Sequence, residues 1–405
     1  MSEFHVLIAG GGVGGLTLAQ GLKRAGVSCA VYERDPAGAP RAGYRLTMNA
    51  DGGNALRACL PDDLYELYLQ TSRKTPPRPL AVVIDDQCHE LTTQPHLGPP
   101  NDGDRPHTAI DRRTLRHILR GRLGEALHDD STITGFTDHG DHVEAQLADG
   151  STVSGAVLVA ADGVGSAVRR RLMPGVEIIP ADVGGLGLFA RSPLTPEIAA
   201  ELPDVLLDGF VIASDGRGGM LALGAYDPRE PVAAAAARLA PDIHMDGVDP
   251  YMMISGGVPP GSGVPAPQDW TPDTPAEVHA RMREVVAGWH PALRGLVERI
   301  DLSTLFWFPF RRLDPVPAWP SSRVTLLGDA IHAMMPTRGQ GANMALRDAG
   351  ILSARLAGAA RGEQPLLEAI GDYEQAMRDY VYPIMDLSED HSRFGGGGLK
   401  QGSEA

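Results

Sequence analysis

Cysteine is scarce in this chain. Only Cys29, Cys59 and Cys88 occur among 405 residues, and their spacing matches neither a disulfide framework nor a metal site. This usage fits a reducing compartment, so we expect a cytoplasmic protein in which the cysteines are small core residues. The 13 histidines are scattered without a ligand pattern, and the sequence therefore predicts no metal.

Positive charge is also in short supply. The chain has 36 Lys and Arg against 51 Asp and Glu, a formal net charge of -15. This balance argues against nucleic acid or an anionic membrane surface as a partner. No apolar run is long enough for a membrane span. The apolar run at residues 4–9 has no basic segment before it and glycines end it, which favours a strand over a signal peptide.

Glycine, by contrast, is abundant, and the first cluster has a recognisable spacing. Gly10, Gly12 and Gly15 lie between an expected strand and an expected helix, and Glu33 ends the next strand. This βαβ arrangement is typical of dinucleotide binding. Gly10 permits the tight turn, Gly12 lets the backbone approach a pyrophosphate, and Gly15 allows close helix packing. The acidic side chain would accept hydrogen bonds from a ribose. The motif does not distinguish FAD from NAD.

A second glycine-rich turn spans residues 328–348. It follows an apolar run that predicts a strand, contains Asp329 and Pro336, and leads into an expected helix at residues 342–356. The start of that helix presents backbone N–H groups and the positive end of a dipole. An anion, or an electron-rich ring that takes on negative charge, would be held well there.

A third marker lies at the centre of the chain. The buried-type strand at residues 157–160 ends at Asp162 and Gly163, and Ser166 and Arg169 fall on the first turn of the next helix. Strand, Asp-Gly turn and helix again follow one another at a chain reversal.

With these three motifs in order, the chain resembles the single-component FAD-dependent monooxygenases of the p-hydroxybenzoate hydroxylase type, the group A flavoprotein hydroxylases. The resemblance extends to about residue 390. It implies an α/β fold, in which a Rossmann-like FAD-binding domain carries an inserted, mostly β substrate domain and a C-terminal helical segment. We expect the FAD-binding domain at residues 1–72, 98–175 and 276–392 and the substrate domain at 73–97 and 176–275. We expect a disordered tail at 393–405.

The resemblance also implies a set of cofactor-binding residues. In the family, the matching Arg112 lies near the FAD phosphates and ribityl chain, Asp329 bonds the ribityl hydroxyls, and Pro336 lies beside the ring where oxygen is activated. Backbone donors from residues 339–343 would face the ring edge. The complete set is Gly10, Gly12, Gly14, Gly15, Glu33, Arg34, Arg41, Arg112, Asp162, Gly163, Gly328, Asp329, Pro336, Gly339, Gly341, Ala342 and Asn343.

The reaction implied by the resemblance uses NAD(P)H, O2 and a flavin hydroperoxide to hydroxylate a small molecule. Pro336 and Arg45 are the residues expected at the reaction centre. The apolar residues of the inserted domain favour an apolar, aromatic or polycyclic substrate, and no carboxylate-clamping set is visible. Epoxidation or Baeyer–Villiger insertion remains an alternative, as does a non-catalytic FAD-binding protein. We expect a monomer or homodimer, with substrate contacts from Phe210, Leu223, Tyr226, Met252 and Phe308.

Structural interpretations compete with these roles. Asp162 and Asp329 could be turn or cap residues, as Asp often is. Arg45 could form a structural salt bridge, and His332 could pack in the core. The run at residues 169–171 is expected to be a solvated basic face rather than a nicotinamide phosphate site.

Overall fold

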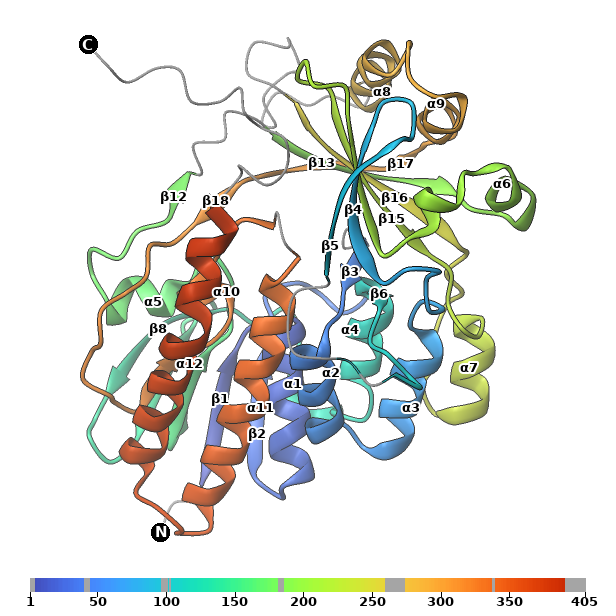
Figure 1. The fold of residues 1–405 in the computed structure, drawn as a ribbon. Coiled ribbons are helices and arrows are strands. Elements are labelled where there is room, and N and C mark those ends of the chain that lie inside the picture. The colour runs from blue at the N-terminus through green and yellow to red at the C-terminus, as the bar shows by residue number, and fades with distance from the viewer. Residues whose placement is uncertain are drawn as a thin grey trace, which may run out of the picture.

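The computed structural model describes residues 4–39, 44–95, 101, 103–180, 186–258, 274–336 and 339–389. The described chain forms two modules, one above the other in Figure 1. The lower module contains both the first and the last described helices, and the upper one is built mainly from strands. Arg41 and the expected tail at 393–405 lie outside the described residues.

A five-stranded parallel sheet organises the lower module, in the order β19-β11-β1-β2-β7. Its central strand carries Val6, Leu7 and Ile8, all fully buried, as expected for a parallel strand that is covered on both faces. The strands are β1 (His5–Ala9), β2 (Ser28–Tyr32), β7 (Leu127–His128), β11 (Val157–Ala160) and β19 (Val324–Leu326).

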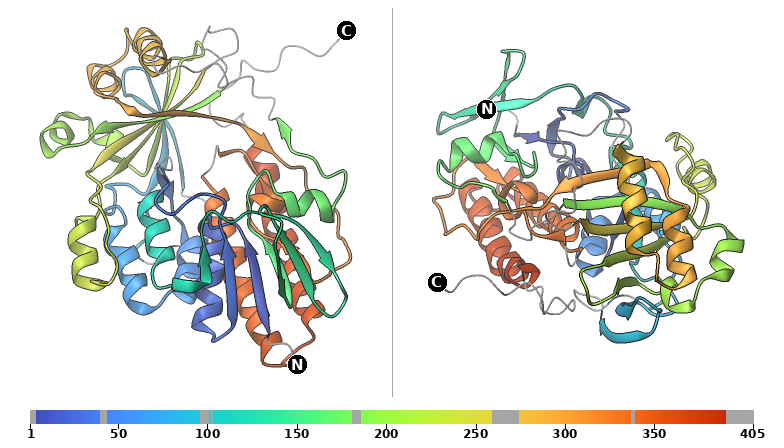
Figure 2. Two further views of the ribbon diagram at one scale, coloured as in Figure 1. Left: turned by 180° about the vertical axis from the view of Figure 1, so that it is seen from behind. Right: turned by 90° about the horizontal axis from the view of Figure 1, so that it is seen from above.

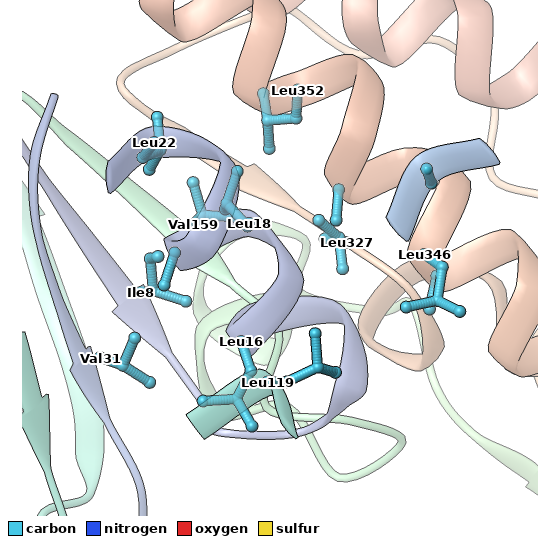
Figure 3. Packing of buried hydrophobic residues seen from close by; sticks show 14 of the residues in the cluster. Ile8, Leu16, Leu18, Leu22, Val31, Leu119, Val159, Leu327, Leu346 and Leu352 are labelled. Atoms are coloured by element: carbon cyan, nitrogen blue, oxygen red, sulfur yellow. The ribbon is translucent and has the colours of Figure 1, made fainter. Parts of the chain in front are cut away.

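Helices and a small antiparallel sheet cover this parallel sheet. The helical layer packs around α11, which contacts the other three members; its helices are α1 (Val13–Arg24), α2 (Ala50–Cys59), α11 (Gly341–Ala360) and α12 (Leu366–Glu389). The opposite side carries the expected meander, β8 (Ile133–Asp138), β9 (Val143–Leu147) and β10 (Thr152–Gly155) (Figure 2). Figure 3 shows the core between sheet and helices, including Ile8, Leu16, Leu18, Leu22, Val159, Leu327 and Leu352.

A seven-stranded sheet forms the upper module, in the order β17-β13-β16-β15-β14-β4-β5. All neighbours are antiparallel except β14 and β4. The strands are β4 (Leu80–Asp85), β5 (Glu90–Pro95), β13 (Leu186–Pro193), β14 (Phe210–Ser214), β15 (Met220–Tyr226), β16 (Tyr251–Val258) and β17 (Asp301–Pro309). Helices α8 (Thr274–Val285) and α9 (Pro291–Glu298) lie on the face turned away from the lower module (Figures 1 and 2).

Short elements connect the modules and complete the chain. The two-stranded sheet of β3 and β6 lies between the modules (Figure 1). The bounds are α3 (Asp62–Thr71), α4 (Arg112–Arg120), α5 (Ala167–Leu172), α6 (Pro196–Glu201), α7 (Val232–Leu239), α10 (Asp329–His332), β3 (Arg45–Thr47), β6 (Ala109–Asp111), β12 (Ile179–Pro180), β18 (Arg311–Arg312) and the 3-10 turns Gly124–Ala126 and Asp204–Leu207.

The expected fold class is confirmed, but the expected domain boundaries differ from the structure. Residues 276–309 fall within the range expected for the FAD-binding domain. In the structure α8 and α9 pack on the seven-stranded sheet, and β17 pairs with β13 in it. Helix α7, expected in the substrate domain, contacts α3 and joins the core of the lower module. Apolar periodicity identifies a helix, but it does not say which sheet the helix covers.

Candidate functional site

The first glycine turn has three close contacts and one open space. Gly10 has φ +102°, and a Cβ there would lie 2.4 Å from the Ala161 carbonyl oxygen. A Cβ at Gly15 would lie 2.2 Å from the Gly10 oxygen, and one at Gly14 2.5 Å from Leu327. At Gly12 a Cβ would meet nothing within 4 Å. The other three glycines are therefore needed for packing, whereas Gly12 borders free space at the start of α1.

Glu33 is buried and contacts this turn at Gly11. Its carboxylate accepts hydrogen bonds from the N–H groups of Gly11, at 2.8 Å, and Asp35, at 2.9 Å. Arg116 approaches the same carboxylate at 3.6 Å and donates to the Gly11 carbonyl at 3.0 Å. Sequence reasoning missed Arg116. Its position one turn after Arg112 on the same helix was the available signal.

The Asp-Gly turn is joined to the second glycine turn by Arg169. This side chain is 1% exposed, and its guanidinium donates to the carbonyl oxygens of Val164 and Ala330, both at 2.9 Å. The expectation of a solvated face at residues 169–171 is therefore wrong for Arg169, because the helix turns that side chain inward between two loops. Arg170 is exposed, as expected.

Asp162 has one satisfied and one unsatisfied carboxylate oxygen. Oδ2 accepts from the Ala167 N–H at 2.9 Å, which matches the cap interpretation. Oδ1 is buried and has no hydrogen-bond partner. Desolvation raises the pKa of this carboxyl group, and the hydrogen bond from Ser166 opposes the rise. A ligand hydroxyl that reached Oδ1 would complete the set. Gly163 has φ +76° and open space at its Cβ position.

Asp329 begins the four-residue helix α10 after Gly328, whose φ of +62° favours glycine. The Asp329 side chain is exposed to solvent, although protein atoms surround much of it. This desolvation raises its pKa, against the charges of His332 and Arg112. Arg112 lies over the Tyr44 ring, 5.3 Å from its centroid. The structure thus brings together Asp329 and Arg112, which lie far apart in the sequence.

His332, at the other end of α10, forms a fully buried pair with Asp348 of α11. The distance from Nε2 to Oδ2 is 2.6 Å. Burial alone would lower the pKa of His332, but the charge and hydrogen bond of Asp348, followed by the charge of Asp329, raise it. The pair therefore fastens α10 to α11. The structure therefore supports the alternative in which His332 packs in the core.

The start of α11 offers free backbone donors. Its N-cap, Gln340, makes no side-chain cap hydrogen bond, and the first intrahelical bond is from Met344 N–H to the Gln340 oxygen. The N–H groups of Gly341 and Ala342 precede that bond, so they have no partner within the helix. A Cβ at Gly341 would lie 3.9 Å from the Asp329 carboxylate.

Asn343 holds this turn in place through its side chain. Nδ2 donates to the carbonyl oxygens of Thr47, at 2.9 Å, and Gly339, at 3.2 Å, and Oδ1 accepts from the Asn49 N–H at 3.0 Å. Gly339 has φ +63°. Pro336, next to the turn, is exposed. Arg34 is also exposed and pairs with Asp35, away from these donors.

Aromatic side chains lie on the face of the upper sheet that is turned toward this turn. Tyr44 stacks on Phe189 with centroids 4.9 Å apart, and Phe306 lies 6.0 Å from Tyr44. Phe210 and Tyr226 belong to the same cluster, together with Tyr251 and Met253. The expected positions of Phe210 and Tyr226 therefore fall on this surface, which we call the inner face.

The other expected substrate residues lie elsewhere. Leu223 and Met252 are fully buried in the core under α8 and α9, on the outer face. Strand alternation explains this, because the neighbouring Tyr226 and Met253 take the opposite face. The side chain of Phe308 is not among those described. Arg45 is buried and bonds to carbonyl oxygens and a hydroxyl group. With the described residues it forms no salt bridge, which was its expected alternative role.

The residues present fit an FAD molecule. Helices α1 and α11 are long, and their N-caps make no side-chain hydrogen bond, whereas Asn49, Asp111 and Ser166 cap α2, α4 and α5. An uncapped helix start suits the pyrophosphate or an electron-rich ring. The free space at Gly12 and the unpaired Asp162 Oδ1 also suit a ligand with phosphates and hydroxyls. Among the described residues no helix could cross a membrane and no group of side chains could hold a metal ion.

Comparisons with known proteins agree with this fit. Residues 315–386 match a family model described as an FAD binding domain. A dual O-methyltransferase/FAD-dependent monooxygenase of Cercospora beticola is 32% identical over 395 residues, which cover 92% of this chain and 44% of that protein. One from Phaeosphaeria nodorum is 29% identical over 97% of this chain and 45% of that protein. The chain thus spans about half the length of these curated relatives.

Solved structures share the fold over nearly the whole chain. A Photorhabdus luminescens protein assigned as an FAD-containing monooxygenase has a TM-score of 0.78 and 29% identity, covering 96% of this chain and 97% of that one. HpxO of Klebsiella pneumoniae, solved with FAD and uric acid, has a TM-score of 0.74 at 21% identity, covering 98% and 90% of the two chains. The match to HpxO supports the fold alone. The motifs, their convergence in space and these relatives show that the chain belongs to the FAD-dependent monooxygenases of the p-hydroxybenzoate hydroxylase type.

Proposed function

We propose that the protein uses NAD(P)H and O2 to hydroxylate an apolar aromatic or polycyclic small molecule. The observation that carries this proposal is the inner face. Tyr44, Phe189, Phe210 and Phe306 are only half-buried. Tyr44 also lies under the guanidinium of Arg112, whose charge acts on Asp329. Half-buried aromatic rings favour a flat apolar ligand. We also propose a cytoplasmic location and a monomer or homodimer.

Bound FAD would supply the redox chemistry, by accepting a hydride from the nicotinamide and activating O2. The protein's own residues bind and orient. Gly12 and α1 would hold the pyrophosphate, Asp329 and Arg112 the ribityl region, and Gly341 and Ala342 would donate N–H groups to the ring edge. Pro336 would border the ring, and the aromatic inner face would exclude water from the other side. Leu223 and Met252 belong to the outer-face core, so they would not contact the substrate.

Epoxidation is the second proposed reaction, and it is supported by similarity to an epoxidase. Zeaxanthin epoxidase of Nicotiana plumbaginifolia is 28% identical over 365 residues, which cover 87% of this chain and 48% of that protein. The same cofactor chemistry serves both outcomes, so product analysis after turnover separates them. A Baeyer–Villiger product would be detected in the same way.

Anaerobic stopped-flow reduction tests the proposal. The purified holoprotein is mixed with NADH or NADPH across a panel of phenols and polycyclic aromatics, and flavin absorbance is followed. Reduction that accelerates with an aromatic ligand is the expected result. Absence of reduction by either nucleotide with every ligand would identify a non-catalytic FAD-binding protein instead.

Two variants locate the site in the same assay. Phe189→Ala should raise the half-saturating ligand concentration about tenfold, or ~1.4 kcal/mol, because it removes one stacked ring. Phe136→Ala, in the meander, is the control and should leave it unchanged. Gly12→Val should fold but purify without flavin, because its side chain would fill free space that the protein does not use. Full flavin occupancy in Gly12→Val would show that the pyrophosphate site is misplaced.

A further inference from the structure

A buried positive charge without a counterion lies between the two modules. Arg45 is 4% exposed. Its Nε donates to the Ala225 oxygen at 3.1 Å, Nη2 to the Gly209 oxygen at 2.7 Å, and Nη1 to the Thr47 hydroxyl at 2.8 Å. All three acceptors are neutral. Within the described part of the chain no carboxylate forms an ion pair with Arg45.

A second buried arginine, Arg73, makes this charge harder to accommodate. It donates to the carbonyl oxygens of Leu207, Asp208 and Gly209, so it shares the Gly209 oxygen with Arg45. Desolvation, reinforced by the charge of Arg73, lowers the pKa of Arg45 to about 9. Desolvation also lowers the pKa of Arg73 to about 10. Both guanidinium groups therefore remain protonated at neutral pH.

The two arginines differ in their electrostatic surroundings. The carboxylates of Asp227 and Asp208 raise the pKa of Arg73 and so compensate its charge in part. Among the described residues no carboxylate raises the pKa of Arg45 in this way, and Tyr251 is the group there that opposes the lowering. Burying a charge without an opposite charge is costly. A neutral side chain could hold the same carbonyl oxygens with less desolvation. The positive charge itself therefore needs an explanation.

Thr47 connects this charge to the ring side of the FAD site. Its hydroxyl accepts from Arg45, while its carbonyl oxygen accepts from Asn343 Nδ2 at 2.9 Å. A Cβ at Gly339 would lie 3.3 Å from the Thr47 Cβ and 3.5 Å from its hydroxyl oxygen. Thr47 is thus packed directly against the turn that precedes α11. Thr47 therefore contacts both Arg45 and that turn.

We propose that Arg45, acting through Thr47, is a positioning residue that stabilises negative charge on the reduced isoalloxazine ring of FAD. This inference rests on the proposed function. A hydride carries two electrons and one proton, so its transfer from the nicotinamide to the neutral oxidised ring leaves one negative charge on the ring and one positive charge on the nicotinamide. A fixed cation in a low-dielectric site favours the charged product and costs no reorganisation when the charge appears.

The test is the equilibrium reduction of bound FAD against a reference dye, because this readout does not depend on turnover. In Arg45→Met the ratio of affinities for reduced and oxidised FAD should fall at least tenfold, which for a two-electron couple lowers the midpoint potential by ~30 mV. Thr47→Val, which removes only the hydroxyl link, should lower the ratio by a smaller factor. Arg45→Lys keeps the charge and should restore most of the wild-type ratio.

Arg73→Met is the matched control. It removes an equally buried guanidinium that binds the same carbonyl oxygen but does not contact Thr47. We expect the protein to lose stability while the ratio changes less than twofold. If Arg45→Met fails to fold, Thr47→Val and Arg45→Lys still test the link.

The proposal is overturned if Arg45→Met or Thr47→Val holds FAD with an unchanged ratio. It is also overturned if the ratio is unchanged while the affinity for a phenolate probe, such as p-nitrophenolate, falls, because Arg45 would then serve an anionic substrate. Failure of the proposed function has a different signature. In that case wild-type protein binds no FAD, or binds it without reduction by NAD(P)H.

Discussion

The seven-stranded sheet has two faces that the same strands build from alternate residues, and the faces differ in chemistry. The outer face is aliphatic and packs under α8 and α9, with Leu223, Met252 and Ile254 almost fully buried. The inner face carries aromatic rings and cations, among them Phe189 and Arg191. The difference shows that one face maintains the fold, while the other faces the proposed site and tolerates half-buried polar groups.

Two neighbouring methionines of β16 test whether the two faces differ in function. Met252 belongs to the outer core and Met253 to the inner cluster, and both are nearly inaccessible. Met252→Ala and Met253→Ala should each lower the free energy of unfolding by about 3 kcal/mol, since both create a cavity. Only Met253→Ala should change the half-saturating ligand concentration. Urea unfolding and the stopped-flow titration measure the two effects. An equal effect of both variants on ligand binding would contradict the division into faces.

A buried ion pair that joins the inner face to α4 gives a smaller effect. Asp111 accepts from Arg191 at 2.7 Å and from the Tyr251 hydroxyl at 2.9 Å, while its other oxygen caps α4. Asp111→Asn keeps a capping oxygen but removes the negative charge that pairs with Arg191, so the free energy of unfolding should fall by about 2 kcal/mol.

Asp129→Asn is the control for that variant. Asp129 pairs with Arg120 in the lower module, where both side chains are 18% exposed, so the loss should stay below about 1 kcal/mol. If the two variants lose the same stability, the inner-face pair has no special role in docking the sheet onto α4.

The smallest expected effect is a pH dependence of the free energy of unfolding, which arises from His332 in the lower module. The raised pKa of His332 means that protonation of His332 stabilises the folded state. This contribution is complete below the unfolded pKa of histidine and is lost as pH rises through the folded pKa. Chemical denaturation of the apoprotein across neutral and alkaline pH should show a decline in the free energy of unfolding that His332→Gln abolishes. An unchanged slope in His332→Gln would assign the decline to other groups.

Sequence reasoning located the turns whose structure depends on local spacing. The turns at Gly10, Asp162 and Gly328 each combine a strand end with a helix start within a few residues, so a linear pattern identifies them. Arg116 and Phe189 were missed because their roles depend on contacts between segments distant in the chain. Alternation in β16 was predictable, but its phase was not, because a strand pattern of Tyr-Met-Met-Ile is apolar on both faces.

The lower sheet pairs strands that lie far apart in the sequence, and this affects how the protein folds. Strand β19 forms the edge of the sheet whose centre is β1, and the α1 turn packs on Leu327. A ribosome must therefore extend the chain beyond Leu327 before the first glycine turn acquires all of its neighbours. Such long-range pairing slows folding. It also means that FAD can recognise only the completed assembly, so added FAD should shift the balance away from partly assembled chains.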